Sequence, residues 1–307
     1  MKTISKIMTI FKSIYDSDSR FKLLYRFGFY NKLSDYEYLK LMFKAYMGKE
    51  LDFNNPKTLN EKIQWLKLYN RKPEYTLMVD KYRVKEYVAN KIGNEYIIPT
   101  LGVWEKFDEI DFKKLPNKFV LKTTHDSGGV VICRDIQNFD QKKAKHKLEN
   151  SLNNNFYLIN REWPYKDVKP RIIAEAYMED KTNSDELTDY KFFCFNGEVK
   201  LMFIATDRQN REEDTKFDFY DECFNHLPFI QGHPNSKREL HKPVNFDKMK
   251  KLASILSEGI PFIRVDLYEI NNKIYFGELT FYHFSGFEPI VPEKWDYKIG
   301  EWIKLPV

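Results

Sequence analysis

Residues 117–133, with the sequence NKFVLKTTHDSGGVVIC, combine side-chain types that suit the binding of an anion. The segment predicts a short strand ending at Lys122, a polar turn containing Gly128 and Gly129, and a second apolar strand. Lys118 and Lys122 share one face of the first strand, and paired glycines let backbone amides approach a ligand. No helix follows the glycines directly, so the segment is neither a Walker loop nor a GxGxxG turn. A polyphosphate ligand and a surface hairpin with a solvated lysine both remain open.

A second group of charged residues lies in residues 261–283, PFIRVDLYEINNKIYFGELTFYH. Two strands are expected, at 262–270 and 274–281, joined by a three-residue loop at 271–273. That loop length places Asp266 opposite Glu278. A two-residue loop would instead put the two carboxylates on opposite faces of the hairpin, so the prediction depends on the register.

Two carboxylates this close need compensation. Directly opposed side chains have Cβ atoms about 5 Å apart, where two unit charges repel by roughly 3 kcal/mol at an effective dielectric of about 20. One solution is a structural salt bridge to Arg264, which the same register places opposite Thr280. The other is a divalent cation, because Mg²⁺ is commonly held by one or two carboxylates together with phosphate oxygens.

Composition excludes several classes of protein. The chain has 307 residues with 42% hydrophobic and 16% aromatic content, enough to bury a large core and to exclude a disordered protein. Its net charge of +5 comes from 50 basic and 45 acidic residues, too small an excess to indicate nucleic-acid binding. The three cysteines are far apart without metal-ligand spacing, which indicates a reducing compartment and thiols that pack as small hydrophobic groups.

No targeting segment is apparent, so we expect a cytoplasmic protein. The apolar run at residues 7–11 is too short for a signal peptide. The first fifty residues carry ten Lys and Arg against five Asp and Glu, and Met8, Phe11 and Tyr15 recur at helical spacing. Association with the inner face of a membrane and packing on the protein's own body are the two alternatives for this segment.

The remaining pattern is helical first and strand-rich later. Helices are expected between residues 35 and 90, one opened by a capping box at Thr58 and Glu61 and another running from about Tyr75 to Lys91. Asn196-Gly197 between two apolar runs predicts a hairpin. Residues 207–243 show little periodicity, which is typical of binding loops or disorder.

The order of these features resembles the ATP-grasp superfamily. Its motifs here are a helix beginning at Asp80-Lys81, the strand and glycine loop after Lys122, a strand ending IIAEAYM, and the pair of carboxylates. Three longer segments, NPKTLNEKIQWLKLYN, DYKFFCFNGEV and GELTFY, look like the branch found in surface-polysaccharide clusters, the group similar to the teichuronopeptide synthesis protein. The resemblance covers about residues 55–281.

This resemblance implies an α+β fold in which two subdomains clasp ATP. The expected parts are a helical N-terminal region at 1–79, a linking helix and strand region at 80–116, a small lid subdomain at 117–178 and a catalytic, metal-binding subdomain at 179–307.

It also implies roles for individual residues. Lys81 and Lys122 would contact the nucleotide phosphates, Glu175 and Met178 the adenine, and Asp266 and Glu278 Mg²⁺. Arg264 would stabilise an acyl phosphate. The remaining predicted ATP-binding residues, in the glycine loop and on a later strand, are His125, Ser127, Gly128, Gly129, Asp189 and Lys191. Thr280 stands where an asparagine ligand is usual, which leaves the number of metals open. His283, Arg208, Arg211 and Lys216 are candidates for holding an anionic substrate.

The activity implied is ATP-dependent amide formation between a carboxylate, on a sugar acid or amino acid, and an amine. Two alternatives are a glycosyltransferase, for which Asp16-Ser17-Asp18 superficially matches a metal-binding D-x-D, and a non-catalytic nucleotide-binding protein. The D-x-D precedes a helix and no strand leads into it, which weakens the glycosyltransferase alternative.

Overall fold

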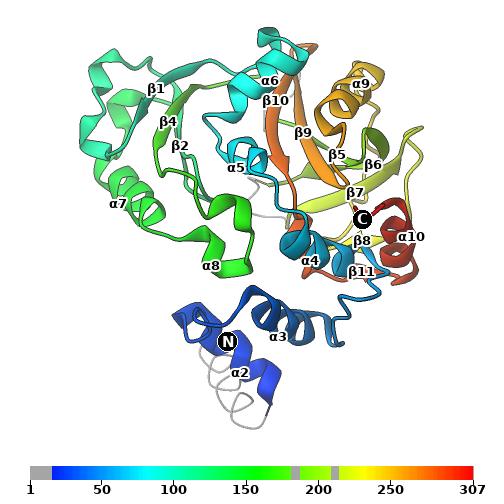
Figure 1. The fold of residues 1–307 in the computed structure, drawn as a ribbon. Helices are drawn as coiled ribbons and strands as arrows, with labels where there is room; N and C mark the ends of the chain where they lie inside the picture. The colour runs from blue at the N-terminus through cyan, green and yellow to red at the C-terminus, as the bar shows by residue number, and fades with distance from the viewer. Residues whose placement is uncertain (1–15, 181–186, 209–213, 307) are drawn as a thin grey trace. The chain divides into compact units, whose positions relative to one another are not determined.

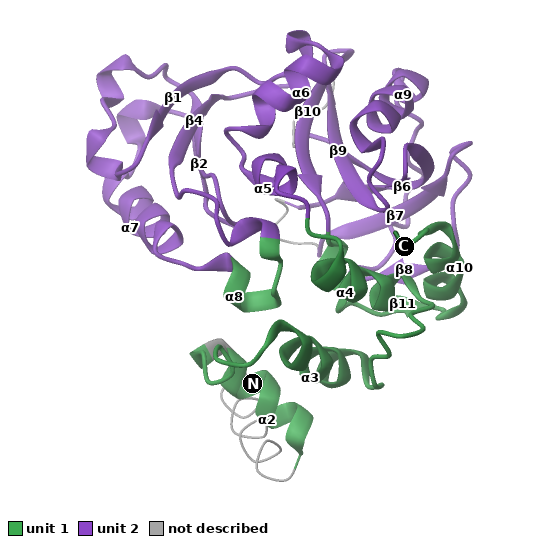
Figure 2. Cartoon of the chain, viewed as in Figure 1, with its two compact units in different colours: residues 1–71, 157–163, 282–307 green, residues 72–156, 164–281 purple. Residues whose placement is uncertain are grey.

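The computed structural model of the chain describes residues 16–180, 187–208 and 214–306. It divides into two compact units, coloured separately in Figure 2. Unit 1 comprises residues 1–71, 157–163 and 282–307, and unit 2 comprises residues 72–156 and 164–281. The chain leaves unit 1 and returns to it twice, so both units combine segments that are distant in the sequence.

Unit 1 is mostly helical. Its elements are α2 (Ser17–Leu24), η1 (Tyr25–Phe27), α3 (Asp35–Met47), α4 (Leu59–Tyr69), most of α8 (Phe156–Asn160), η7 (His283–Gly286), β11 (Ile290–Val291) and α10 (Lys294–Trp302). The predicted capping box at Thr58 and Glu61 is confirmed, and Ser34 and Glu37 form a second one at the start of α3. Apolar side chains of α2 and α3 form a core that also includes Phe53 and Phe287.

A buried lysine holds an unusual turn in unit 1. Phe284 and Ser285 both have left-handed backbone angles, with φ of 47° and 53°. The Nζ atom of Lys67 donates hydrogen bonds to the carbonyl oxygens of Ser285 and Asn160, at 2.8 and 2.9 Å. Burial lowers the pKa of Lys67 to about 7, although the carboxylate of Glu162 favours its charged form. The turn after residue 281 is therefore fixed by α4.

Unit 2 contains two antiparallel sheets, which confirms the α+β class. The first has the strand order β1-β4-β2-β3. Its strands are β1 (Thr100–Trp104), β2 (Phe119–Thr123), β3 (Val130–Cys133) and β4 (Ile172–Ala176). The predicted pair of strands around the glycine turn is confirmed, since Phe119 pairs with Cys133 and Lys122 with Val130.

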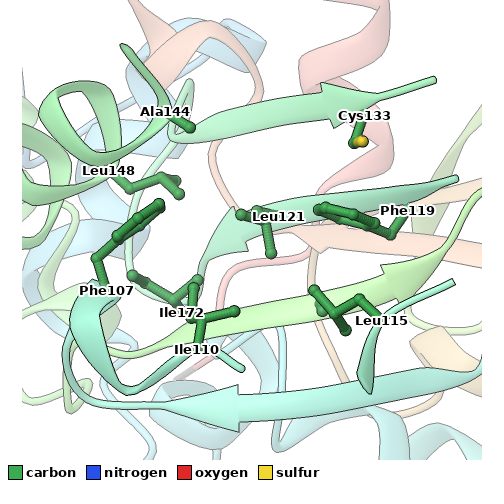
Figure 3. Packing of buried hydrophobic residues seen from close by; sticks show 10 residues of the cluster. Phe107, Ile110, Leu115, Phe119, Leu121, Cys133, Ala144, Leu148 and Ile172 are labelled. Carbon is green, nitrogen blue, oxygen red and sulfur yellow. The ribbon is translucent and has the colours of Figure 1, made fainter. Parts of the chain in front are cut away.

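One face of this sheet is packed with apolar side chains. Phe119 and Leu121 of β2 belong to one buried apolar cluster with Ile172 of β4 and Leu148 of α7 (Gln141–Leu152), as Figure 3 shows. Short helices on the connecting segments complete this part of the unit: η3 (Phe107–Glu109), η4 (Phe112–Lys114), η5 (Ile136–Asn138) and η6 (Trp163–Tyr165), the last of which begins in unit 1. Because side chains alternate along β2, Lys118, Val120 and Lys122 point away from this core.

The second sheet has the order β10-β9-β5-β6-β7. Its strands are β5 (Asp189–Phe195), β6 (Glu198–Thr206), β7 (Lys216–Asp221), β9 (Ile263–Ile270) and β10 (Lys273–Thr280), and β8 (Ile230–Gln231) is a separate short strand. The hairpin predicted at Asn196-Gly197 is confirmed, because Phe195 pairs with Glu198. Helix α9 (Phe246–Ser257) packs on β5, β6 and β9 (Figure 1). The ring of Phe246 on α9 lies 6.1 Å from that of Phe192 on β5. Helix α9 therefore covers the face of the sheet that contains Phe192, and the adjacent residue Lys191 points to the other face.

The single helix predicted from about Tyr75 to Lys91 is wrong. The chain forms α5 (Glu74–Val79) and α6 (Val84–Ile92), followed by η2 (Asn94–Tyr96). Asp80 between them is extended, with φ −72° and ψ 110°. Its carboxylate accepts hydrogen bonds from the backbone N–H groups of Tyr82 at 2.9 Å and Arg83 at 3.2 Å. The carboxylate of Asp80 therefore stabilises a turn that separates the two helices.

Two smaller predictions also need correction. Residues 207–243 are not wholly irregular, because β7 pairs with β6 from Lys216 to Asp221. Phe219 and the adjacent Tyr220 of β7 are both buried. Two neighbouring aromatic residues interrupt the alternation of apolar and polar residues by which a strand is recognised in a sequence. Cys133 and Cys194 are buried as predicted, whereas Cys223 is exposed in the turn after β7. Met8, Phe11 and Tyr15 lie outside the described residues, and no described helix is long and apolar enough to cross a membrane.

Candidate functional site

The glycine loop between β2 and β3 is closed by its own polar groups. Asp126 accepts hydrogen bonds from the hydroxyls of Thr123 and Ser151, so its carboxylate points into the protein. Gly129 lies against this cluster, and a Cβ atom there would overlap both hydroxyl oxygens. Gly128 has a left-handed φ of 103° with open space around it. The loop thus keeps its one negative side chain away from the surface that a phosphate would meet.

Two other predicted loop residues differ in exposure. Ser127 is exposed at the tip of the loop. His125 is buried at its base, with Nε2 lying 3.3 Å from the carbonyl oxygen of Asn154. Burial lowers the pKa of His125, although the Asp126 carboxylate opposes this effect. His125 therefore lies beneath the loop rather than at its exposed tip.

Lys81 connects the α5–α6 turn to the glycine loop. Its Nζ atom donates a hydrogen bond to the carbonyl oxygen of Asp126, and its backbone N–H donates to the carbonyl of Thr124 at 3.1 Å. Burial lowers the pKa of Lys81, while Glu278 of β10 is the strongest of the neighbouring charges that favour its ammonium form. The next strongest effects come from Asp126 and Lys122. Charged groups of both sheets therefore act on the Lys81 amine.

Glu175 on β4 is held between two lysines. Its Oε2 atom lies 2.6 Å from Nζ of Lys122, and its Oε1 atom lies 2.5 Å from Nζ of Lys85 on α6. Although burial alone would raise its pKa, the two ammonium groups lower it, so Glu175 is an anion. Met178 follows β4 by two residues and is half-buried. Two of the predicted nucleotide-binding residues, Lys122 and Glu175, are thus in direct contact.

The hairpin of β9 and β10 places Asp266 opposite Glu278, as predicted. The predicted three-residue loop is wrong, however, because Ile270 pairs with Lys273 and the turn contains only two residues. A β-bulge between Phe276 and Glu278 adds one residue and returns Glu278 to the face of Asp266. Gly277 occupies this bulge, where a Cβ atom would lie 3.0 Å from the carbonyl oxygen of Asp266.

Arg264 joins the two carboxylates. Its Nε atom donates to Oδ1 of Asp266 at 2.7 Å, and one terminal nitrogen donates to Oδ2 at 2.7 Å. The same nitrogen donates to Glu278 at 2.9 Å and to the hydroxyl of Thr280 at 3.0 Å. Burial alone would raise the pKa of Asp266, but Arg264 and then Lys191 hold it far below its ordinary value. The structural salt bridge considered from the sequence is therefore present.

Asp189 and Lys191 extend this network along β5. Lys191 is the register partner of Asp266 and donates to its Oδ2 atom. Lys191 also lies 2.7 Å from Oδ2 of Asp189, which accepts a second hydrogen bond from Arg208 at 2.8 Å. The predicted residues of β5, β9 and β10 therefore form one charged face, opposite the face that α9 covers.

The remaining candidates belong to other parts of the chain. His283 belongs to unit 1, whereas the charged face belongs to unit 2. Arg211 lies outside the described residues, and Lys216 begins β7. In the D-x-D of the glycosyltransferase alternative, Asp16 caps α2 by accepting a hydrogen bond from the backbone of Ser19 at 2.9 Å.

Two cavities lie outside the candidate site. One of about 880 Å³ lies between α6 and the segment leading into β1, and Lys85 is part of its lining. A second of about 510 Å³ lies between β3 and α7. Neither is lined by Lys81, Lys122 or the two carboxylates of the hairpin. The site is instead recognised by the convergence of charged side chains from both sheets.

The hairpin has a donor set that fits one hard cation. The side chain of Glu278 is 46% exposed, and its Oε1 atom accepts hydrogen bonds from Arg264 and Thr280. Among the described residues, none donates to its Oε2 atom. A half-exposed carboxylate oxygen beside a second carboxylate is a suitable ligand for Mg²⁺, which is commonly bound by one or two carboxylates and by phosphate oxygens.

Several interacting residues could not be identified from sequence. Lys85 contacts Glu175 from a helix about ninety residues earlier in the chain, and nothing in the local pattern of α6 marks it. The burial of Asp126 is also not apparent from the sequence, because polar residues of a glycine-rich turn are expected to face solvent. The pairing of Arg208 with Asp189 depends on the adjacency of β5 and β6, although the Asn196-Gly197 hairpin predicts that adjacency.

Comparison with known proteins adds a family and a set of structures. The sequence profile of the family described as TupA-like ATPgrasp matches residues 61–304. No curated protein matches the chain. Among solved structures, D-alanine-D-alanine ligase from Helicobacter pylori has 14% identity and a TM-score of 0.42, with 80% of this chain and 69% of that chain covered.

Two further solved structures are similar over about half of their own length. N5-carboxyaminoimidazole synthetase from Staphylococcus aureus has 14% identity and a TM-score of 0.39, with 75% of this chain and 53% of that chain covered. The ATP-grasp ligase PsnB, complexed with a minimal precursor, has 8% identity and a TM-score of 0.38, with 68% and 54% covered.

Proposed function

Because the chain belongs to the TupA-like ATP-grasp family, we propose that it is an ATP-dependent ligase that joins a carboxylate to an amine. The observation that carries this proposal is a charged cluster on each sheet of unit 2. Lys122 pairs with Glu175 on the first sheet, and Arg264 joins Asp266 and Glu278 on the second. The Lys81 amine is affected by charges of both clusters. Two lysines, a carboxylate pair and an arginine therefore converge from two sheets, the charge distribution that phosphoryl transfer requires.

In the proposed reaction, a substrate carboxylate oxygen attacks the γ-phosphorus of ATP, and the bond to the ADP oxygen breaks. The amine then attacks the carbonyl carbon of the acyl phosphate, loses a proton, and phosphate leaves. Lys81, Lys122 and the amides of the glycine loop bind the phosphates. Arg264 stabilises the negative charge that develops on the transferred group. Glu175 and the backbone at Met178 bind the adenine.

Positioning accounts for most of the proposed catalysis. Phosphoryl transfer needs alignment and charge neutralisation more than a covalent nucleophile. Arg264 is suited to this because its pKa is raised; burial opposes its charge, but Asp266 and Glu278 more than compensate. Mg²⁺ held by Asp266 and Glu278 would supply further neutralisation of the phosphate charge. Asp189 and Lys191 would line the same cleft.

The substrate class is proposed from the resemblance of three sequence segments to proteins of surface-polysaccharide clusters. A sugar acid or an amino acid would supply the carboxylate. The segment 207–243 is proposed to hold this anion through Arg208, which pairs with Asp189 on the charged face. We further propose that the enzyme acts in the cytoplasm, where ATP is available, with the basic N-terminal segment at the inner face of the membrane.

Isotope transfer tests the proposed reaction. The protein is incubated with ATP, Mg²⁺ and mixtures of sugar acids and amino acids, and ADP release identifies active pairs. Each active carboxylate is then supplied with ¹⁸O. We expect one labelled oxygen in the released phosphate, measured by mass spectrometry, because the carboxylate oxygen that attacks phosphorus leaves with it. Product formed with unlabelled phosphate would exclude the acyl phosphate.

The two alternatives give different results in the same assay. A non-catalytic nucleotide-binding protein would show ATP-induced stabilisation without ADP release. A glycosyltransferase would transfer sugar from a nucleotide sugar without consuming ATP. Asp16 of the D-x-D caps α2, a structural role that does not support the glycosyltransferase alternative.

A further inference from the structure

Lys191 occupies a position between two buried carboxylates. Its ammonium group donates to Oδ2 of Asp266 and lies 2.7 Å from Oδ2 of Asp189. The side chain of Lys191 is only 9% exposed, and those of Asp189 and Asp266 are less exposed still. The register fixes this arrangement, because Lys191 and Asp266 are direct partners on adjacent strands. A long, flexible lysine is thereby held at one point beside the proposed metal ligands.

Asp266 has little remaining capacity to bind metals. A carboxylate offers about four lone-pair positions on its two oxygens. Arg264 uses one on each oxygen at 2.7 Å, and Lys191 uses a second one on Oδ2. One position on Oδ1 remains. This position on Oδ1 and the Oε2 atom of Glu278 provide one ligand from each carboxylate for a single cation. No lone pair is left on Oδ2 of Asp266 for a second cation.

The charges on this face are already balanced. From β6 to β10 they alternate in sign along a continuous series of contacts: Arg208, Asp189, Lys191, Asp266, Arg264 and Glu278. Each cation contacts at least one anion, and the charge of Asp189 is compensated at Oδ2 by Lys191 and Arg208, although its buried Oδ1 atom accepts no hydrogen bond among the described residues. In residues 16–180, 187–208 and 214–306, no group of three or more His, Cys, Asp and Glu side chains is arranged to hold a metal.

Thr280 strengthens this argument. Its hydroxyl accepts a hydrogen bond from Arg264 at 3.0 Å and donates one to Glu278 at 3.3 Å. The hydroxyl therefore bridges the arginine and the carboxylate of the hairpin. An asparagine carbonyl at this position would add an oxygen ligand, whereas the threonine hydroxyl is engaged by its neighbours.

We propose that the ammonium group of Lys191 takes the place of a second metal ion, so that the chain binds one divalent cation with each nucleotide. The cation is held by Glu278 with Asp266, and Lys191 supplies fixed positive charge on the other side of Asp266. This inference rests on the proposed binding of ATP. It assigns Lys191 as the residue that sets the number of metals.

Manganese stoichiometry tests the inference without relying on turnover. The full chain is saturated with a non-hydrolysable ATP analogue and titrated with Mn²⁺, and free Mn²⁺ is measured by electron paramagnetic resonance. We expect one Mn²⁺ per chain for the wild type. Lys191→Met, which keeps the length of the side chain and removes its charge, should bind two. Lys191→Arg, which keeps the charge, should bind one.

A matched control is Lys200→Met on β6, whose lysine pairs with Glu198 at 2.5 Å and is more exposed. It should bind one Mn²⁺. Two Mn²⁺ ions in the wild type would overturn the inference even if Lys191→Met failed to fold, and so would one ion in folded Lys191→Met. Failure of the analogue to bind at all would overturn the proposed function and this inference with it, whereas tight binding with two ions would overturn only the inference.

Discussion

Replacing Asp266 with asparagine should destabilise the protein in the absence of metal and nucleotide. The buried carboxylate accepts two hydrogen bonds of 2.7 Å from Arg264 and a further one from Lys191. Asparagine has nearly the same volume but keeps only one acceptor atom, and its amide group faces a cationic donor. Asp266 is thus both a proposed metal ligand and a partner in an ion pair, so the two roles considered from the sequence coexist.

The expected size of the effect follows from this geometry. Breaking a buried ion pair by removing one partner costs roughly 3–5 kcal/mol. Because asparagine keeps one carbonyl oxygen as an acceptor, we expect Asp266→Asn to cost about 3 kcal/mol, at the lower end of this range. At about 2 °C per kcal/mol for a large chain, the melting temperature should fall by about 6 °C. The measurement is urea unfolding followed by tryptophan fluorescence, in EDTA, with calorimetry for the melting temperature.

Asp247→Asn on α9 is the matched control. Its carboxylate is 79% exposed and lies 3.4 Å from Lys250, so its loss should change the unfolding free energy by less than about 0.5 kcal/mol. In a double-mutant cycle, Lys191→Met should cost less in the Asp266→Asn background than in the wild type, because the ion pair between the two residues is already lost. A stability of Asp266→Asn equal to that of the wild type would refute the pairing described here.

Three further predictions concern pH and the glycine loop. Because the pKa of Asp266 is lowered in the folded protein, its stabilising effect over Asp266→Asn should persist above about pH 5 and decline as the pH falls below about 4, near the unfolded value of about 3.9; urea unfolding from pH 3 to 7 measures this, and a constant difference would contradict it. Burial lowers the pKa of Lys67 to about 7, so the unfolded state binds more protons above that pH, and the wild type should gain stability from pH 7 to 9 relative to Lys67→Met in the same assay; parallel profiles would count against it. Gly129→Ala should lower the melting temperature more than Gly128→Ala, because only the first Cβ overlaps neighbouring hydroxyl oxygens, whereas the second meets open space and adds a backbone cost of about 1–2 kcal/mol; equal losses would refute the packing argument.

The sequence predicts the carboxylate pair correctly but through the wrong loop. A three-residue turn would align Asp266 with Glu278, and the protein obtains the same alignment from a two-residue turn and a bulge. Gly277 in the middle of a strand is a recognised sign of a bulge, and Asn271-Asn272 can both adopt the left-handed angles of a two-residue turn. Both features are local, so the sequence itself contains the signal for the two-residue turn and the bulge.

Other parts of the site depend on contacts between distant segments. The order of strands around the glycine turn follows from local patterns, and so does the hairpin at Asn196-Gly197. The contact of Lys85 with Glu175 and the burial of His125 do not, because each depends on tertiary packing of segments far apart in the chain. Local pattern therefore predicts which residues carry charge, while the partners of those charges come from the fold.

The central claim, that ATP binds through the charges gathered around the glycine loop, is tested most directly by calorimetric titration of Lys122→Ala with ATP and Mg²⁺. A hydrogen bond to a charged group contributes about 1.5–3 kcal/mol, so the dissociation constant should rise by about 10-fold to 150-fold. Lys118→Ala is the matched control. Lys118 directly precedes β2 and pairs with Glu179 at 2.6 Å, so this variant should bind ATP like the wild type. Equal affinity of Lys122→Ala and the wild type, or no ATP binding by either, would contradict the account.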